Sequence, residues 1–317
     1  MTRKEIGILL LLVALCTVVA IASPQFLSVA NLQNVGRLVG TYGIFSIGVG
    51  IVIITGGIDL SVGSICALLG VLLSMMLVEW RWPAPVALAA VLALGGGLGA
   101  THGVLIARLR LQPFIVTLCG LLLYRGAARY IASDATKGFG TGKGFEWLRV
   151  LASGSVGGVP MPFVTMCVVA ALAWVLLHRS VYGRHLFAVG RNEEAARYSG
   201  VGTRAVIAWA YVLSGVLAAM SAIIIAFYTN SISPASHGNF YELYAIAAAV
   251  VGGCSLQGGE GSVLGIVLGA ALLQVLRNLV NLLDIPGSLD FAVMGAVILI
   301  GAAADQLFGR RLRTQRE

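Results

Sequence analysis

Side chains that could take part in catalysis are too far apart in this sequence to form a recognisable active site. A zinc hydrolase would need two histidines in HExxH spacing, whereas the four histidines stand singly, at His102, His178, His185 and His237. Ser61 and Ser64 flank Gly63 without the GxSxG pattern that exposes a nucleophilic serine. We therefore predict that the chain is not an enzyme, that it holds no metal ion, and that His102 is a hydrogen-bonded structural residue.

A glycine-rich run, Gly138 to Gly144 (GFGTGKG), is the one stretch that could suggest phosphate binding. A P-loop needs a glycine five positions before the glycine that precedes its lysine, and a serine or threonine after that lysine. Position 137 is a lysine, and Gly144 follows Lys143. The sequence therefore predicts no nucleotide site and no bound cofactor in this chain.

Polar residues inside apolar segments are costly in a membrane, so they are candidates for function. Asp59 lies in Gly56-Gly57-Ile58-Asp59-Leu60-Ser61, where the glycines predict a helix break. We favour capping of the next helix by Asp59 over contact with a transported solute. Glu242 begins another apolar segment, where a negative charge suits the start of a helix.

A second set of polar residues recurs at helical spacing near the C-terminal end. These residues are Gln274, Arg277, Asn281 and Asp284. Spacings of three and four place them on one helical face. We expect that face to avoid lipid, either by lining a path or by meeting another subunit, although Arg277 could also extend its charge to the membrane surface.

The stretch 179–204 is the longest charged island in the second half, with seven charged side chains. Glu193 to Tyr198 are predicted to form a short helix, because Asn192 is a good N-cap and acidic residues suit the first turn. Gly200 suits the end of such a helix. Two interpretations stay open on these residues alone: a helix that inserts into a soluble partner, and an ordinary solvated loop.

Composition sets the fold class. Of 317 residues, 58% are hydrophobic and 11% charged, and mean hydropathy is +0.94. A soluble protein of this size would need a more highly charged surface, so this surface must face lipid. The 41 glycines agree, since small residues let membrane helices approach closely. We predict an all-α, polytopic membrane protein in a single domain, 1–317. The net charge of +8 is spread between apolar runs, so we expect no nucleic-acid partner.

About ten segments are long enough, or nearly so, to cross the hydrocarbon layer, and some of them are expected to be broken. They cover residues 6–22, 39–55, 61–78, 85–106, 112–131, 161–178, 205–228, 242–256, 262–283 and 287–304. The first is favoured as an uncleaved helix over a signal peptide. Glycine-rich stretches at 51–63 and 250–262 are expected to be turns that link short apolar segments, or alternatively broken helices.

Positive charge predicts the orientation, because Lys and Arg are retained on the cytoplasmic side. With the N-terminus inside, thirteen of these residues fall in cytoplasmic pieces and five in external ones. Both termini, the 179–204 loop and a short basic tail at 305–317 are therefore expected in the cytoplasm. The polar stretches 132–159 and 229–241 are expected outside, where they offer a docking surface.

Three ordered motifs resemble the permease subunits of ABC importers, and more specifically those of the ribose and related monosaccharide group. The first is Thr55 to Ser64 (TGGIDLSVGS). The second is Glu194-Ala195-Ala196 followed by Gly200, within the longer run Gly183 to Val201. The third is Tyr241 to Gly253, continued by Ser255-Leu256 and Gly258-Gly259. In the third motif Tyr244 stands where the family commonly has aspartate, which leaves the particular sugar open.

This resemblance implies partners. An ATP-binding cassette subunit would bind ATP and Mg²⁺ on another chain, an extracytoplasmic sugar-binding protein would deliver the solute, and a second permease copy or paralogue would complete the pore. The location implied is the bacterial cytoplasmic (inner) membrane. Alternatives are a permease for branched-chain amino acids or another small polar solute, and a secondary transporter using its broken helices.

The resemblance also suggests roles for individual residues. Coupling to the ATPase is expected from Gly190, Asn192, Glu193, Glu194, Ala195, Ala196 and Gly200. A sugar path needs hydroxyl-matching groups that bind loosely enough for release. Candidates for that path or for the helix break are Gly56, Gly57, Asp59, Ser61, Ser64, Tyr244, Gln274, Arg277, Asn278 and Asn281.

Overall fold

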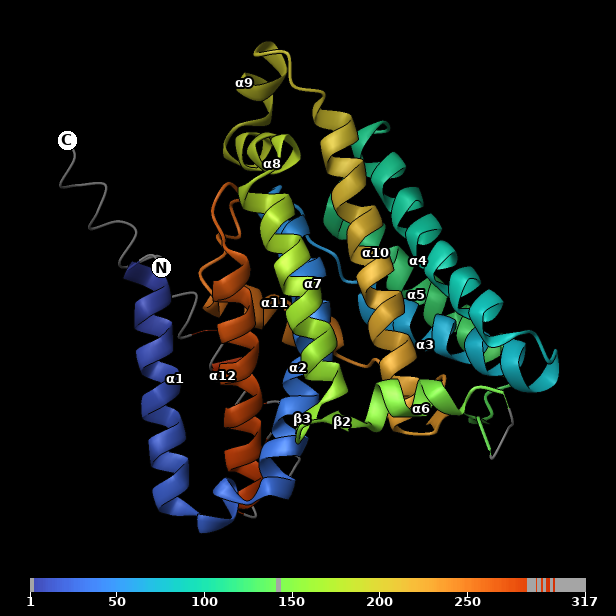
Figure 1. Cartoon of the computed structure of the whole chain (residues 1–317). Coiled ribbons are helices and arrows are strands. Elements are labelled where there is room, and N and C mark those ends of the chain that lie inside the picture. The colour runs from blue at the N-terminus through green and yellow to red at the C-terminus, as the bar shows by residue number, and fades with distance from the viewer. Residues whose placement is uncertain are drawn as a thin grey trace.

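Eight long apolar helices form the body of the part of the chain that the structure describes. The computed structural model describes residues 3–140 and 144–283, with five single positions between 289 and 299. The helices are α1 (Arg3–Ala22), α2 (Val29–Ile54), α3 (Val62–Ser74) with its π-helical continuation η2 (Met75–Glu79), α4 (Ala84–Ala107), α5 (Pro113–Ile131), α7 (Met161–His178), α10 (Thr203–Tyr228) and α12 (Val263–Leu282). They run up and down side by side (Figure 1). Their span-forming stretches, of 18 to 26 residues, are long enough to cross a membrane, which confirms the polytopic all-α prediction.

Short elements gather at the two ends of this bundle. At one end, the upper one in Figure 1, lie α8 (Val181–Arg191) and α9 (Glu193–Tyr198), and we call it the α9 end. The opposite α6 end carries α6 (Glu146–Ser153), η1 (Pro24–Leu27) and the antiparallel pair β2 (Ser155–Val156) and β3 (Val159–Pro160). A second antiparallel pair joins β1 (Lys137–Gly138) to β4 (Ser231–Ile232). A short apolar helix, α11 (Tyr241–Val251), lies inside the bundle.

Two of the expected spans differ from the structure. The segment expected at 242–256 is the 11-residue α11, too short to cross a membrane alone. Helix α2 begins at Val29, ten residues before the expected start at 39. The polar sequence of its first turns favours a loop. In the structure these turns are helical, and Asn31 exchanges two hydrogen bonds with Asn278 of α12, at 2.8 and 3.0 Å. Asp284, the tail (305–317) and all but five positions of the expected tenth span (287–304) lie outside the described residues.

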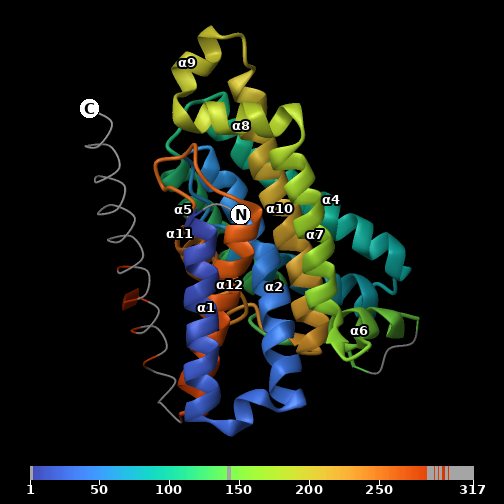
Figure 2. The ribbon, with the colours of Figure 1, turned by 60° about the vertical axis from the view of Figure 1, so that its left-hand side comes forward.

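Helices α4 and α10 pack closely along a row of glycines. Gly95, Gly99 and Gly103 recur every four residues on α4, so they share one face of the helix. A Cβ atom at Gly99 would meet the Tyr211 backbone of α10, and one at Gly103 would meet Ala208. Close approach of this kind is typical of small residues repeated at this spacing in membrane helices. Helices α2, α3 and α10 are largely buried, whereas α1 is mostly exposed and packs on α12 (Figure 2).

Candidate functional site

The chain breaks its helical path between α2 and α3, as the glycines predict. Helix α2 ends at Ile54, Gly56 adopts a left-handed conformation (φ +83°), and α3 begins at Val62. We call the intervening residues 55–61 the first break. Since a left-handed φ costs glycine little, Gly56 can turn the chain away from α2 there.

Asp59 is buried in the first break, with 1% of its surface exposed. Its Oδ1 accepts hydrogen bonds from the backbone N–H and the hydroxyl of Ser61, at 3.0 and 2.6 Å. Its Oδ2 accepts a hydrogen bond from the Ser214 hydroxyl of α10 at 2.8 Å. Asp59 thus binds Ser61, the residue that immediately precedes α3, whereas no side chain caps the first turn of that helix. The preference for capping over contact with a solute stays a prediction. No described Lys or Arg side chain pairs with this carboxylate.

His102 continues the hydrogen-bonded chain from α4 to α5. Its Nδ1 lies 3.4 Å from Ser61 Oγ, and its Nε2 lies 2.9 Å from Tyr124 Oη. Because the Ser61 hydroxyl donates to Asp59, it can only accept from Nδ1–H, and Nε2 then accepts from the Tyr124 hydroxyl. His102 is 2% exposed. The prediction that it is a hydrogen-bonded structural residue is confirmed.

The backbone of the first break is held as well. The carbonyl of Ile58 accepts hydrogen bonds from the Tyr211 hydroxyl of α10 at 3.2 Å and from the Thr117 hydroxyl of α5 at 3.3 Å. Ser64, a further candidate, donates its hydroxyl to the Ser61 carbonyl at 2.7 Å. Sequence reasoning missed Ser214, Tyr211, Thr117 and Tyr124. Thr117 and Tyr124 lie on α5, and Tyr211 and Ser214 lie on α10. The one signal that marks them is a polar side chain within a largely apolar helix.

A second break lies at 229–240, between α10 and α11. Arg125 of α5 donates two hydrogen bonds from Nη1, to the carbonyls of Pro234 (2.8 Å) and His237 (2.6 Å). Gly63 contacts the Gly238 backbone and the Glu242 carboxylate, so the first turns of α3 and α11 meet inside the bundle. Part of the stretch expected as an external loop therefore folds inward. This contact also fits the structural role expected of Glu242.

The glycine-rich stretch expected at 250–262 is a turn that links two apolar helices, which is one of its two expected structures. Residues 252–261 form a turn between α11 and α12 at the α9 end, where Gly259 N–H donates to the Ile54 carbonyl at 2.9 Å. The same turn contacts Gly190 of α8 through Gly259. Lys4 pairs with Glu260 of this turn at 3.1 Å, so the N-terminal end of α1 also lies there. The glycines of this turn leave room for its close contact with Ile54 and Gly190.

The short helix predicted at 193–198 is confirmed as α9. Asn192 Oδ1 accepts a hydrogen bond from Ala195 N–H at 2.9 Å, which caps the helix, and Gly200 (φ +84°) follows its end. Ala196 is buried, whereas Ala195 and Glu194 are exposed, and Glu194 forms a 3.7 Å ion pair with Arg197. Helix α8 was not expected. Its Tyr182 donates to the Val206 carbonyl at 3.1 Å, and burial raises the pKa of Tyr182, which therefore remains a donor at neutral pH.

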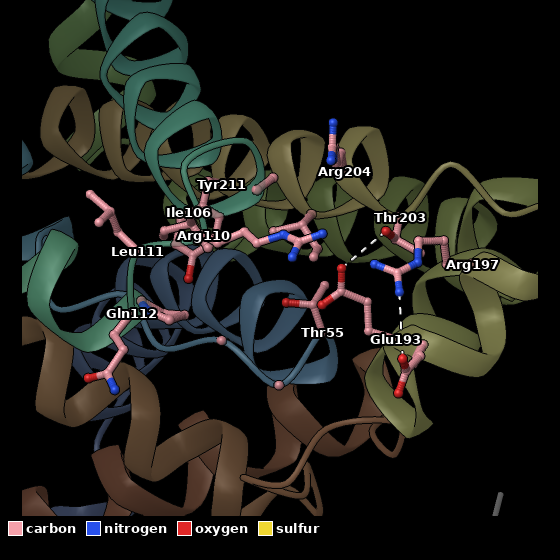
Figure 3. Close-up of a pocket in the computed structure, with 16 residues that line it drawn as sticks. Thr55, Ile106, Arg110, Leu111, Gln112, Glu193, Arg197, Thr203, Arg204 and Tyr211 are labelled. Atoms are coloured by element: carbon pink, nitrogen blue, oxygen red, sulfur yellow. Dashed lines mark hydrogen bonds and ion pairs between the residues drawn. The ribbon is translucent and has the colours of Figure 1, made fainter.

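A cleft of about 540 Å³ opens between α9, the α4–α5 turn and the first break. Figure 3 shows Arg110, Glu193, Arg197 and Arg204 around it, with Thr55 and Tyr211 on its inner side. Glu193 Oε1 accepts a hydrogen bond from the Thr203 hydroxyl at 3.1 Å. Gly56 and Gly57 also line the cleft. The structure thus brings residues predicted for coupling next to residues predicted for the helix break.

The remaining candidates form a separate cluster between α2, α11 and α12. Arg277 lies over the Tyr244 ring, 5.4 Å from its centroid, and its Nη1 lies 3.4 Å from Tyr42 Oη. Gln274 is 3% exposed, and its Oε1 has no hydrogen-bond partner among the described residues. Asn278 binds Asn31 as described above, and Asn281 is exposed. This face of α12 packs largely against its own chain.

The comparisons with known proteins match nearly the whole chain. Residues 31–302 match the protein family described as "Branched-chain amino acid transport system / permease component". The ribose import permease protein of Escherichia coli K12 is 38% identical over 305 residues, which are 96% of this chain and 94% of that protein. Its counterpart in Haemophilus influenzae is 35% identical, with 95% and 92% covered.

A third relative is named for a different sugar. The D-allose transport system permease protein of Escherichia coli K12 is 31% identical over 96% of this chain and 92% of that protein. No solved structure matches this chain. The chain therefore belongs to the branched-chain amino acid transport system permease family, and the relatives it resembles within that family include ribose import permeases.

Proposed function

We propose that this chain is the permease subunit of an ABC importer that carries a monosaccharide of the ribose, pentose or hexose class across the bacterial cytoplasmic membrane. The observation that carries the proposal is its similarity, over nearly the whole chain, to permeases named for ribose and D-allose. The family description names branched-chain amino acids. Branched-chain amino acids are therefore the second candidate solute.

The energy for transport would come from ATP hydrolysed on a separate ATP-binding cassette subunit, which would hold the ATP and Mg²⁺. We propose that this subunit docks on α9 and the surrounding cleft. Support comes from the compact, capped helix with exposed Ala195 and Glu194 and from the hydrogen bond that ties Glu193 to α10. The coupling role of Gly190, Asn192 and Gly200 is part of the same proposal.

The orientation proposed puts the α9 end, and both termini, in the cytoplasm. Described cations at or near that end are Lys4, Arg108, Arg110, Arg179, Arg184, Arg191, Arg197 and Arg204. Those toward the α6 end are Arg37, Arg81, Arg129, Lys137 and Arg149. This excess of positive charge is what the cytoplasmic side of a membrane protein carries. A sugar-binding protein would then dock at the α6 end.

Transport would proceed by alternating access, with a second permease copy or paralogue completing the path. Closure of the ATPase subunits would displace α9 and reorient the helices around the two breaks. Tyr244, Gln274 and Arg277 are the proposed solute-facing candidates near α11. The Tyr244 hydroxyl and the Gln274 amide can match sugar hydroxyls without a net charge, and Arg277 adds a positive charge beside the Tyr244 ring.

Reconstitution tests this function. The permease, its ATPase and its binding protein are placed in lipid vesicles, and ATP-dependent uptake is measured with labelled ribose, allose, xylose and leucine. Uptake of a sugar that needs ATP and the binding protein is expected. Uptake of leucine alone would favour the second candidate, and uphill transport by the permease without the ATPase would contradict the proposal.

Charge reversal at α9 tests the coupling role. Glu194→Lys is expected to lower ATP-driven uptake at least about tenfold, because an exposed charge at the docking surface would meet its partner with the wrong sign. The matched control is Glu260→Lys, at another exposed, ion-paired glutamate of the α9 end. Equal uptake by both variants, with equal amounts in the membrane, would show that α9 is not the coupling element.

A further inference from the structure

Helix α9 is fastened to the start of α10. Only residues 199–202 separate the two helices. The Thr203 hydroxyl donates to Glu193 Oε1 at 3.1 Å, and Thr203 is 3% exposed. The hydrogen bond therefore joins the first turn of α9 to the first turn of α10. A displacement of α9 moves the end of α10 with it.

Helix α10 is in turn fastened to the first break. Tyr211, two turns into α10, donates to the Ile58 carbonyl, and Ser214 donates to Asp59 Oδ2. Tyr211 is fully buried and Ser214 is 1% exposed. A hydrogen bond to a carboxylate is about twice as strong as one between neutral groups. The Ser214 bond is therefore the stronger of the two.

The other oxygen of Asp59 holds the start of α3, through the N–H and hydroxyl of Ser61. One carboxylate thus spans α10 and α3. Water is excluded from this position, so a group that leaves the bridge would find no replacement partner. The connection to α2 differs, since it runs through the backbone at Thr55 and the left-handed Gly56.

We propose that Asp59 is a positioning residue that joins α10 to the start of α3, so that a displacement of α9 reaches the helix break inside the bundle. This inference rests on the proposed function, in which an ATPase subunit moves α9. Asp59 acts here through Ser61 and Ser214 and does not need to touch the solute.

The test is Ser214→Ala, which removes the hydroxyl between α10 and Asp59. The control is Ser221→Ala, seven residues further along α10, where a fully buried hydroxyl donates to the Thr41 carbonyl of α2 at 3.4 Å. The full complex in vesicles is assayed for ATPase stimulation by the loaded binding protein and for sugar molecules imported per ATP hydrolysed.

Ser214→Ala is expected to lower the number of sugars imported per ATP about tenfold, the factor associated with losing one hydrogen bond to a charged group. ATPase stimulation should stay within about twofold of the unmodified complex, because α9 is still present. A variant that merely destabilised the fold would lower both readouts together. Equal transport per ATP in Ser214→Ala and Ser221→Ala would overturn the inference.

A distance measurement provides an independent readout. Spin labels at Val78, near the end of η2, and Trp209, on α10, are both exposed. They are introduced as cysteines after replacement of Cys16, Cys119 and Cys167. The distance between the labels is expected to be the same with and without ATP, and to differ between the two states once Ser214→Ala is added.

A distance unaffected by Ser214→Ala in both states would contradict the link. A complex that shows no ATP-driven uptake at all would instead contradict the proposed function. In that case the label distances would still report whether Asp59 holds α3 to α10.

Discussion

The two breaks in the bundle are held by different chemistry. In the first break, side chains form the hydrogen bonds. The Asp59 carboxylate binds Ser61 and Ser214, and His102 extends this hydrogen-bonded network to Tyr124. In the second break, the chain's own carbonyls, at Pro234 and His237, accept hydrogen bonds from the distant Arg125.

This difference matters because both breaks must satisfy backbone groups away from water. A local carboxylate can cap the next helix within two residues, which fixes the geometry of the chain around it. A single arginine from another helix fixes only two carbonyl oxygens. Residues 231–232 of the second break also pair with β1, and Ser233 N–H donates to His237 Nδ1 at 2.8 Å. We therefore expect residues 233–240 to be joined to the rest of the bundle mainly by one side chain, Arg125, and the first break by several. Three substitutions test that contrast.

The largest effect is expected where the breaks meet. In Gly63→Leu, the added side chain would overlap the Gly238 backbone and the Glu242 carboxylate. The cost should be about 3 kcal/mol or more, at the upper end for overpacking, because backbone cannot yield as a side chain does. Detergent-solubilised protein should then run as aggregate in size-exclusion chromatography. Gly126→Leu, at a glycine of α5 with open space around it, is the control and should run as the unmodified protein does.

A smaller effect is expected from Arg125→Leu, which leaves the carbonyls of Pro234 and His237 without their donor. An unsatisfied buried polar group costs about 1 to 3 kcal/mol. Hydrogen–deuterium exchange should speed up at residues 233–240, which follow the β1–β4 pair, and remain unchanged at 55–61. Arg129→Leu, one turn further along α5, removes an exposed arginine paired with Asp134 and should leave both segments unchanged. Faster exchange in both breaks would mean that they are held as one unit.

The smallest effect is expected from Tyr124→Phe, which removes the donor to His102 Nε2 at the far end of the side-chain network. The loss should be about 1 kcal/mol, because Asp59 keeps its bonds to Ser61 and Ser214. Thermal unfolding in detergent measures it, against Tyr130→Phe, whose ring is 88% exposed. A loss as large as that in Arg125→Leu would show that the first break also depends on a single contact.

Sequence reasoning found the first break because its determinants are local. Asp59 stands among glycines and two residues before Ser61, so the turn and the residue that binds its end lie within six residues of each other. Helix α9 was found for the same reason, from Asn192 and Gly200. Both are cases in which local hydrogen bonding fixes the structure.

The second break was missed because its donor, Arg125, is more than a hundred positions away in the sequence. Helix α8 was missed because Gly183 and Gly190 suggest a loop. In the structure they permit close contact, Gly183 with the end of α7 and Gly190 with Ile54. The first turns of α2 were read as loop because Asn31 finds its partner only in α12. Long-range pairing of this kind leaves no pattern in the local sequence.

The glycine row between α4 and α10 has a mechanical consequence. Two helices whose backbones are in contact bend together. The pair therefore resists bending more strongly than two separate helices would. A force on one end of α10 would then translate or tilt the whole helix and would bend it little. Bulky side chains at Gly95, Gly99 or Gly103 would push α4 and α10 apart, so that each helix could bend independently.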